Sequence, residues 1–284
     1  MAYITWNEKT VERFEKEGRG TGEGSQYKPW LNIGEVPSGG RTADPFGLKT
    51  HRPHQLLSKN ELAFFYLLEW ASDVVDIREQ YPLLDRSETQ DVAMQIGAVH
   101  PFYPGTGVAT VMTVDFMVTR VRNGLKVLHG YDVKETSEAE NEHSIGKLEI
   151  ARETLHRKGI AHDLVFSSML PKAEVTNIAW IRGGQKRPSE AEPHPRFFEE
   201  QMEALASDMR STNFTGTLED FCAQFDSRSG VGRGTGLRVA RMLMLARVVQ
   251  APLASEAHLA SLPVGEFTVT GLPGQLHVVT GGKQ

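Results

Sequence analysis

The chain has 284 residues, of which 39% are hydrophobic and 24% are charged, and these fractions are typical of a globular protein with one large or two ordinary domains. The formal net charge of −5 argues against a protein that coats nucleic acid by charge alone. No stretch approaches the roughly 18 consecutive apolar residues of a membrane span, and the first residues contain no apolar signal core, so we expect a cytoplasmic protein with no membrane partner.

The first 57 residues are predicted to form an irregular N-terminal arm with one short polar helix near residues 7–17. The glycine-rich run at residues 18–24 superficially resembles a phosphate-binding loop. It has no Gly-Lys-Ser/Thr sequence and no preceding strand, so we interpret it as part of a flexible arm.

A basic loop follows at residues 39–54, where a single aspartate, Asp44, stands among several cationic side chains. Such a composition suits a loop that follows a phosphate backbone. The predicted DNA contacts in this loop are Arg41, Lys49 and Arg52. His51 and His54 would otherwise suggest a metal pair, but without further ligands nearby this is the less favoured interpretation.

A helix is expected from Ser58 to Trp70, because its apolar residues follow the helical period and Ser58 with Glu61 fits a capping box. Capping is the simpler explanation of Glu61. The alternative is that this glutamate projects across the sheet toward Asp115 as a metal ligand.

Strands are predicted for much of the segment that follows this helix. Residues 74–81 alternate as a strand, and residues 85–109, rich in glycine, proline and polar residues, are predicted to form a loop. Residues 110–122 and 125–134 then form a β-hairpin. Its turn is Asn-Gly, the strongest short hairpin signal, because both central residues of a type I′ turn need positive φ.

The hairpin places two aspartates opposite each other. If Asn123 and Gly124 form a two-residue loop, Arg122 faces Leu125, and Asp115 consequently faces Asp132. Side chains alternate along a strand. The residues on the face of the two aspartates are therefore Thr113, Asp115, Met117, Gly130, Asp132 and Lys134. Those expected to face the core are Val114, Phe116, Val118, Tyr131 and Val133.

The facing aspartates suggest a metal site. Two carboxylates about 5 Å apart, at an effective dielectric constant of about 20, repel by roughly 3 kcal/mol. A hard cation such as Mg²⁺ offsets this repulsion and is typically held by one or two carboxylates plus phosphate oxygens. Lys134 is placed to meet a phosphate or to activate a water, and Gly130 leaves room for something to approach. The alternative is that these charges lie on a solvated hairpin face, and a β-bulge would undo the pairing.

Beyond the hairpin, a helix at about residues 144–158 and a short apolar strand at residues 162–166 are expected. Strand, helix and strand imply a right-handed crossover that adds a parallel strand to the hairpin sheet. We therefore expect residues 58–167 to form a catalytic domain, in which a mixed α/β sheet has helices on its faces.

Residues 168–284 are predicted to form a second, mainly α domain. Residues 183–194 resemble a linker, and helices are expected at residues 195–210, from Thr217 to Phe225, and from Thr235 to Arg247. Strands at residues 267–270 and 276–279 would form a terminal hairpin, and three helices with such a hairpin suggest a winged helix. The single cysteine, Cys222, excludes an internal disulfide and any zinc site built on cysteines.

The third of these helices is a candidate DNA-binding helix. Five arginines and no acidic residue lie between Ser227 and Val249. The predicted contacts are Arg238 and Arg241. An equally favoured interpretation is that both arginines lie on a solvated face, because winged helices often bind proteins.

A helix-borne glutamate, an aspartate on one hairpin strand and Asp-x-Lys on the next form the arrangement of the restriction-endonuclease-like nucleases. More specifically, the chain resembles the TnsA family, the endonuclease subunits of heteromeric bacterial cut-and-paste transposases. The resemblance covers most of residues 17–134 and is faint past about residue 168. It is carried by EGRGTGEGSQYKPWL, EVPSGGR, KTHRPHQLLS, ELAFFYLLEW and VVDIREQYPLL, and by VDF and VKE on the two hairpin strands.

The resemblance implies a catalytic set and a cofactor. Glu61 in ELAFF, Asp115 in VDF and Lys134 in VKE match the catalytic positions of the family. Asp132 stands where a relative has glutamine, so this chain is nearer the general nuclease pattern. The implied metal ligands are Asp115, Asp132 and Glu61, and the implied metal is Mg²⁺, for which Mn²⁺ would substitute.

The resemblance also implies partners. TnsA-like proteins cut the 5′ ends of the transposon, an integrase-type transposase subunit cuts and joins the 3′ ends, and an ATPase regulator of transposition contacts both. The expected partners are therefore the transposon-end DNA, the transposase subunit and the ATPase. The alternatives are a stand-alone restriction or repair endonuclease of the same fold, or a non-catalytic DNA-binding or adaptor protein.

Overall fold

The computed structural model describes residues 4–35, 42–138, 142–187 and 189–271. The chain divides into two compact units, Met1–Leu170 and Pro171–Gln284. Within the described ranges, no helix has the length and apolar character needed to cross a membrane.

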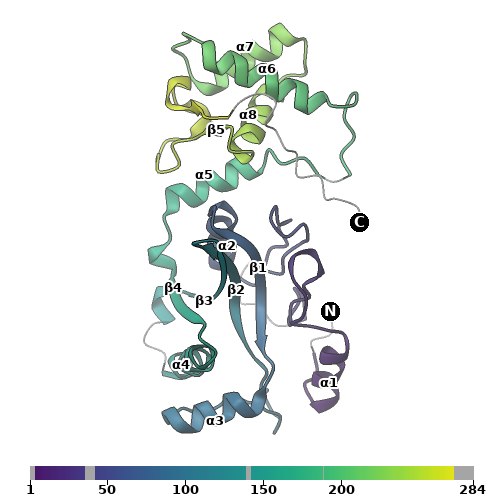
Figure 1. Ribbon diagram of the computed structural model, residues 1–284, viewed down its shortest axis with the longest axis vertical. Coiled ribbons are helices and arrows are strands. Elements are labelled where there is room, and N and C mark those ends of the chain that lie inside the picture. The colour runs from purple at the N-terminus through teal and green to yellow at the C-terminus, as the bar shows by residue number, and fades with distance from the viewer. Residues whose placement is uncertain (1–3, 36–41, 139–141, 188, 272–284) are drawn as a thin grey trace. The chain divides into compact units, whose positions relative to one another are not determined.

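The first unit is built on one four-stranded sheet in the order β1-β2-β3-β4 (Figure 1). The strands are β1 (Val74–Leu83), β2 (Met112–Arg122), β3 (Leu125–Lys134) and β4 (Ala161–Phe166). The pairs β1/β2 and β2/β3 are antiparallel, whereas β3/β4 is parallel. The predicted mixed sheet, with a hairpin and a crossover to a parallel strand, is therefore confirmed.

The hairpin turn has the predicted geometry. Asn123 has φ 51° and Gly124 has φ 77°, as both central residues of a type I′ turn require. Arg122 pairs with Leu125, and the ladder continues without a bulge to the pair of Phe116 and Tyr131. This register points Asp115 and Asp132 at each other one step beyond the last paired residues.

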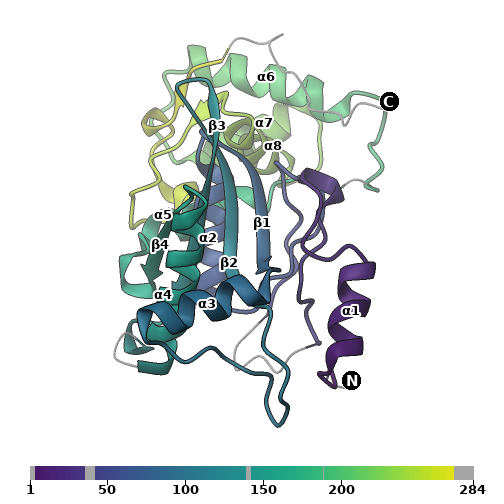
Figure 2. The ribbon, with the colours of Figure 1, turned by 60° about the horizontal axis from the view of Figure 1, so that its bottom comes forward.

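Helices cover both faces of this sheet. One face packs against α2 (Lys59–Trp70), which contributes Phe64, Phe65 and Leu68 to a buried cluster with β1, β2 and β3. The other face packs against α3 (Arg86–Ile96) and α4 (Glu142–Arg157). In Figure 2, α3 crosses in front of the strands and α2 lies behind them.

Helix α3 corrects the prediction of a loop at residues 85–109. The side chain of Asp85 accepts a hydrogen bond from the backbone N–H of Glu88, and Gly97 ends the helix in the left-handed conformation. Both ends of the helix are therefore capped by residues that also commonly occur in loops. Val92 and Ala93 are its buried apolar residues, so its apolar stripe is narrow.

The residues of β2 do not keep to one face along the whole strand. Phe116 packs with α2, but Val114 packs with α3 and α4, so the expectation that these two share a core face is wrong. The change of face coincides with Gln80, a buried residue of β1 with φ 47°. A left-handed non-glycine residue is uncommon in a strand. At Gln80 it interrupts the alternation of side chains between the two faces of the sheet, although the β1/β2 register is the same before and after this residue.

The N-terminal segment packs on the sheet and is not a free arm. It includes the expected short helix, α1 (Glu8–Lys16), which Asn7 caps, and it lies beside β1 in Figure 1. The backbone N–H of Trp30 donates to the carbonyl of Gln80 at 3.2 Å. Gly20 lies so close to β1 that a Cβ atom there would come within 2.1 Å of Pro82. The segment therefore covers edge strand β1, whose unpaired backbone groups would otherwise be exposed.

The second unit contains all three helices expected there. They are α6 (Phe197–Ser211), α7 (Leu218–Ser229), whose first turn is capped by Thr217, and α8 (Thr235–Leu245). A further helix, α5 (Lys172–Arg182), was not predicted. Cys222 is buried in α7.

A short strand pair follows these helices. Strand β5 (Val249–Gln250) pairs antiparallel with β6 (Thr268–Val269), which falls in the first predicted strand of the terminal hairpin. The second strand of that hairpin, residues 276–279, lies outside the described residues. Single turns of 3-10 helix occur in both units, at Gly24–Gln26, Thr136–Glu138, Ser167–Met169, Leu259–Ser261 and Val264–Glu266.

The room left by Gly130 is filled by the protein itself. A Cβ atom at this position would lie 2.7 Å from Leu155 and 3.1 Å from the ring of His162. We therefore expect Gly130→Ala to lower the free energy of unfolding by about 1–3 kcal/mol through overpacking, measured by denaturant titration. Gly107→Ala is the control, because a Cβ atom at Gly107 would meet open space. Equal stability of the two variants would contradict this packing.

Candidate active site

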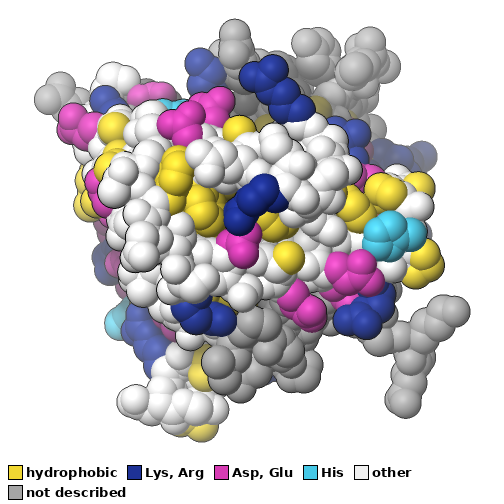
Figure 3. Space-filling view, turned by 90° about the horizontal axis from the view of Figure 1, so that it is seen from above, with side chains coloured by type: hydrophobic (Ala, Val, Ile, Leu, Met, Phe, Trp, Pro, Cys, Tyr) yellow, Lys and Arg dark blue, Asp and Glu magenta, His cyan; other side chains and the backbone are white. Residues whose placement is uncertain are grey.

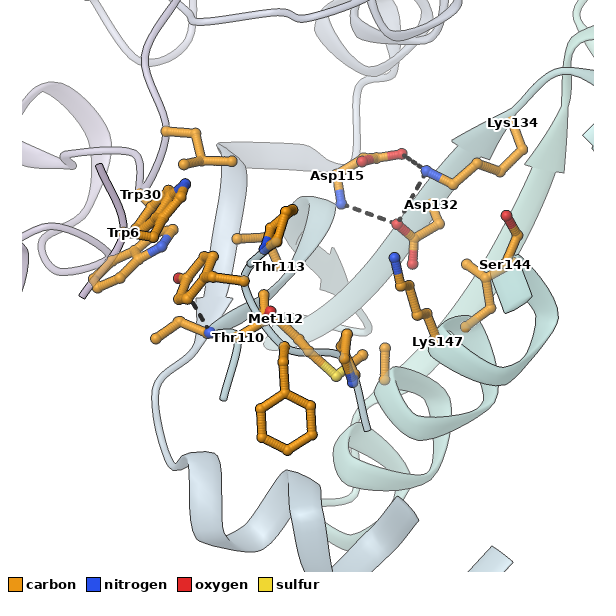
Figure 4. Close-up of a pocket in the computed structure, with 18 residues that line it drawn as sticks. Trp6, Trp30, Thr110, Met112, Thr113, Asp115, Asp132, Lys134, Ser144 and Lys147 are labelled. Atoms are coloured by element: carbon orange, nitrogen blue, oxygen red, sulfur yellow. Dashed lines mark hydrogen bonds and ion pairs between the residues drawn. The ribbon is translucent and has the colours of Figure 1, made fainter. Parts of the chain in front are cut away.

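Asp115 and Asp132 meet at the end of the β2/β3 ladder (Figure 4). The backbone N–H of Asp115 donates to Oδ1 of Asp132 at 3.3 Å, and the backbone N–H of Val133 donates to Oδ2 of Asp115 at 2.8 Å. Carboxylate oxygens thus accept hydrogen bonds from the backbone of the opposite strand, and the two acidic side chains are held at the junction of the strands.

The ammonium group of Lys134 joins the two carboxylates. Its Nζ lies 3.0 Å from Oδ2 of Asp115 and 3.8 Å from Oδ1 of Asp132. Burial lowers the pKa of Lys134, but the two aspartates outweigh burial and raise it above its ordinary value. Lys134 is therefore a cation in this arrangement, and of the two roles expected for it, binding a phosphate or a water fits better than removing a proton.

The aspartates are buried, so the alternative of a solvated hairpin face is wrong. Asp115 is 8% exposed and Asp132 is 3% exposed. Burial raises the pKa of Asp115; Lys134 lowers it and the Asp132 carboxylate raises it further. The two carboxylates together therefore carry more negative charge than the single ammonium group of Lys134 neutralises.

Glu61 has the capping role, and its role as a metal ligand remains a prediction. Its backbone N–H donates to the side chain of Ser58 at 3.1 Å, and its Oε2 accepts from the backbone N–H of Leu57 at 2.9 Å, so it belongs to the helix cap. The side chain is also buried and lies within electrostatic range of the active site. Burial, followed by the charge of Asp115, raises its pKa to about 7. The amide of Gln80 donates to the same carboxylate at 3.3 Å.

The donor set suits a hard divalent cation. Asp115 and Asp132 present carboxylate oxygens, and burial together with the charge of Asp115 raises the pKa of Glu61, so a cation nearby would favour its charged form. Among the residues that the structure describes, no group of three or more His, Cys, Asp or Glu side chains is arranged to hold one ion. The remaining ligands of an ion at Asp115 and Asp132 would be water or phosphate oxygens, as is common for Mg²⁺.

His162 is a site residue that the sequence did not reveal. Its Nε2 lies 2.8 Å from Oδ2 of Asp132, and both side chains are almost fully buried. The register of β4 on β3 pairs His162 with Gly130, two residues before Asp132. The histidine therefore fixes the orientation of the Asp132 carboxylate, a role that partners of metal-binding residues commonly have.

A cavity of about 680 Å³ opens at the aspartates. Asp115, Asp132 and Lys134 line it, and so does Lys147 of α4, which points toward Asp132 in Figure 4. Glu61 is not among its lining residues. Lys147 is the second site residue that sequence reasoning missed, because a half-buried lysine on a helix has no signal of its own.

The basic loop is held inside the first unit. Arg52, 7% exposed, donates two hydrogen bonds to the buried carboxylate of Glu79, at 2.7 and 2.6 Å, and His54 contacts the same carboxylate at 2.7 Å. Lys49 donates to the backbone carbonyls of Ala71 and Val74. The structure thus favours structural roles over the predicted DNA contacts of Arg52 and Lys49, and over a metal pair at His54. Arg41 lies outside the described residues.

The arginines of the second unit are also engaged within the protein. Arg238 donates to Glu190 at 2.7 Å, and Arg241 donates to the carbonyl of Trp180 at 2.7 Å. On the face in Figure 3, described side chains of both charges are interspersed with hydrophobic ones and form no continuous basic patch. The predicted DNA contacts of Arg238 and Arg241 remain predictions.

Comparison with known proteins identifies relatives of both units. The family described as "TnsA-like endonuclease N terminal" matches residues 71–167, and the family described as "TnsA endonuclease C terminal" matches residues 170–253. The chain is 39% identical over 180 residues to "Transposon Tn7 transposition protein TnsA" of Escherichia coli. That alignment covers 63% of this chain and 64% of the length of the relative. Asp115, Asp132 and Lys134 lie inside the first match, and Glu61 precedes it.

Replacing Arg52 tests whether it supports the fold or contacts DNA. Arg52→Met leaves the buried Glu79 carboxylate without its guanidinium partner, so we expect the free energy of unfolding to fall by about 3–5 kcal/mol. Arg122→Met, at an exposed arginine of the hairpin, should change it by less than about 0.5 kcal/mol. Denaturant titration measures both. A fully stable Arg52→Met variant with weakened DNA binding would restore the predicted DNA contact.

Ionisation of Glu61 should make stability depend on pH when no divalent cation is bound. Its folded pKa of about 7 exceeds the ordinary 4.5, so the folded chain holds the proton more tightly and stability falls as pH rises between these values. We expect Glu61→Gln to be more stable than the wild type at pH 8, by on the order of 2 kcal/mol, and to differ little at pH 5.

Thermal unfolding in chelator at both pH values measures this difference. Glu149→Gln, at a half-exposed glutamate of α4, is the control and should show no such pH dependence. A Glu61→Gln difference of the same size at pH 5 and pH 8 would contradict the raised pKa.

Proposed function

Because this chain belongs to the TnsA endonuclease family, we propose that it is the Mg²⁺-dependent endonuclease subunit of a transposase and cuts the 5′ ends of the transposon during cut-and-paste transposition. The observation that carries this proposal is the buried pair of Asp115 and Asp132 with the ammonium group of Lys134 between them. Burying two like charges side by side is energetically unfavourable. A purely structural role would not explain why the protein keeps them there.

Asp115 and Asp132 would hold the cation, and Glu61 would act on it from a greater distance. When bound, Mg²⁺ supplies Lewis acidity and orients the attacking water and the phosphate. His162 keeps the Asp132 carboxylate in position through its 2.8 Å contact.

The side chains of the protein would divide the remaining work of phosphodiester hydrolysis. Nζ of Lys134, which stays protonated, donates hydrogen bonds to the phosphoryl oxygens and stabilises the charge that develops on them. The attacking water must lose a proton as its oxygen bonds to phosphorus. The Glu61 carboxylate, whose pKa of about 7 is near working pH, suits a proton acceptor reached through water. The bond to the 3′ oxygen breaks, and that oxygen takes up a proton from solvent.

The proposed partners follow from the same family membership. They are the transposon-end DNA, an integrase-type transposase subunit that cuts and joins the 3′ ends, and an ATPase regulator of transposition. The second unit, with helices α6, α7 and α8 and the β5/β6 pair, is proposed to be a winged helix that contacts either DNA or the ATPase.

The function is tested by combining the chain with its transposase partner, donor DNA and Mg²⁺, and by measuring breaks on each strand. We expect Asp115→Asn and Lys134→Met each to reduce 5′-strand breaks by about a hundredfold or more while 3′-strand breaks persist. Asp163→Asn is the matched control, because this aspartate lies on β4 with a side chain that is 63% exposed.

The other outcomes identify the alternatives. Metal-dependent cutting by the purified chain without any partner would favour a stand-alone restriction or repair endonuclease. Undiminished 5′ breaks in both variants would contradict the site assignment. No breaks by the wild type under any condition would favour a DNA-binding or adaptor protein.

A further inference from the structure

The active-site cavity has two chemically different ends. Asp115, Asp132, Lys134 and Lys147 lie at one end of the 680 Å³ cavity. The labelled Trp6 and Trp30 lie at the other, with Thr113 between the two ends (Figure 4). The proposed phosphodiester hydrolysis uses only the residues of the polar end. Trp30 and Tyr103 at the aromatic end belong to a buried apolar cluster against which Trp6 packs, and the proposed reaction gives this end no role.

The aromatic end is a wall of flat rings. Trp6 and Tyr103 stack with their centroids 3.9 Å apart and their planes 7° apart, and Trp30 continues the wall. Phe102 also lines the cavity and is 51% exposed. Phe102, whose ring contacts His100, is thus a half-exposed aromatic side chain in the lining of the cavity, which a flat ligand could cover.

The polar end has a cation without an assigned partner. No ion pair links Lys147 to any carboxylate of the described residues, whereas Lys134 is bound to both aspartates. Lys147 lies on α4 and points toward Asp132. It is therefore placed to bind an anionic group that arrives between the aspartates and the helix.

A ligand of this cavity must have a flat apolar part and an anionic part. A paired duplex offers the protein its phosphates and sugars, while its bases face each other and cannot reach a ring inside a pocket. A nucleotide turned out of the duplex offers both parts, since every base has a face that stacks on aromatic side chains. The cavity volume falls within the range of about 300–1,000 Å³ that is usual for sites enclosing small ligands.

We propose that this cavity holds one unpaired nucleotide of the DNA next to the phosphate that is cut: its base stacks on the accessible aromatic lining, at Trp6 and Phe102, and Lys147 binds its phosphate. The proposal rests on the proposed function, because it assumes that the chain cuts DNA at Asp115 and Asp132. It adds that the strand must open locally at the cut position, which the carboxylates and Lys134 alone do not require.

A double-mutant cycle tests this proposal, in which a protein side chain and a DNA base are removed separately and together. The cut position is first mapped with the wild-type chain, its transposase partner and Mg²⁺. Duplexes spanning that position are then made with an intact base or an abasic nucleotide at each position flanking the cut. Their dissociation constants are measured in chelator, where no cutting occurs, for the wild type and its variants.

Phe102→Ala is the main variant, because this side chain is half exposed and its loss should not unfold the protein. We expect it to weaken binding of the intact duplex by about fivefold or more, the lower end of what stacking of one base contributes. At one flanking position the abasic duplex should bind wild type and Phe102→Ala equally. Trp6→Leu should show the same dependence at the same position.

Two further variants separate base contacts from backbone contacts. Lys147→Met should weaken binding of intact and abasic duplexes by the same factor, as expected for a phosphate contact. Leu125→Ala, at the exposed hairpin tip outside the cavity, should change neither.

The proposal is overturned if Phe102→Ala and Trp6→Leu leave binding unchanged, or if they weaken intact and abasic duplexes equally at every flanking position. The latter outcome would mean that the wall supports only the fold or a sugar contact. Cutting is measured separately on the same proteins. If the wild-type chain cuts DNA but its binding does not depend on a flanking base in this way, only this inference is contradicted. If the chain never cuts, the proposed function is contradicted and this inference with it.

Discussion

The organisation of the first unit depends on keeping two like charges buried side by side. Asp115 and Asp132 are held together because the hairpin register points them at each other and because backbone N–H groups of the opposite strands donate to their carboxylates. The ammonium of Lys134 supplies the nearest positive charge. Such a pair persists in the folded state only when each charge is hydrogen-bonded. Helix α4 and strand β4 bring Lys147 and His162 to this pair, and helix α2 places Glu61 within electrostatic range of it.

The same constraint explains features that otherwise look unrelated. Gly130 lacks a side chain because the ring of His162, which contacts Asp132, occupies that space together with Leu155. Gln80 takes a strained backbone conformation next to the site, where its amide reaches Glu61. The buried cluster of Arg52, His54 and Glu79 fastens the N-terminal loop to β1 immediately before Gln80. The surroundings of the candidate active site thus contain several hydrogen-bonded polar contacts as well as the apolar core.

The hairpin and its aspartate pair could be predicted from sequence because a type I′ turn at Asn123-Gly124 fixes the register by local rules. His162 and Lys147 could not, because their positions depend on how the crossover places β4 and α4, and neither residue carries a local signal. The sequence predicts DNA contacts for Arg52 and Lys49 because it does not distinguish a basic side chain that binds a phosphate from one that binds a group inside the protein. Helix α3 was missed because its caps, Asp85 and Gly97, resemble loop residues and its apolar stripe is narrow.

Direct measurement of Mn²⁺ binding tests the central claim, that Asp115 and Asp132 form a divalent-cation site. The loss of the free Mn²⁺ signal in electron paramagnetic resonance can be followed while the metal is titrated into the wild-type chain and into a double variant with Asp115→Asn and Asp132→Asn. We expect the wild type to bind Mn²⁺ and the double variant, folded by circular dichroism, to have lost that binding. Equal Mn²⁺ affinity of the two proteins, or no binding by either, would contradict the account.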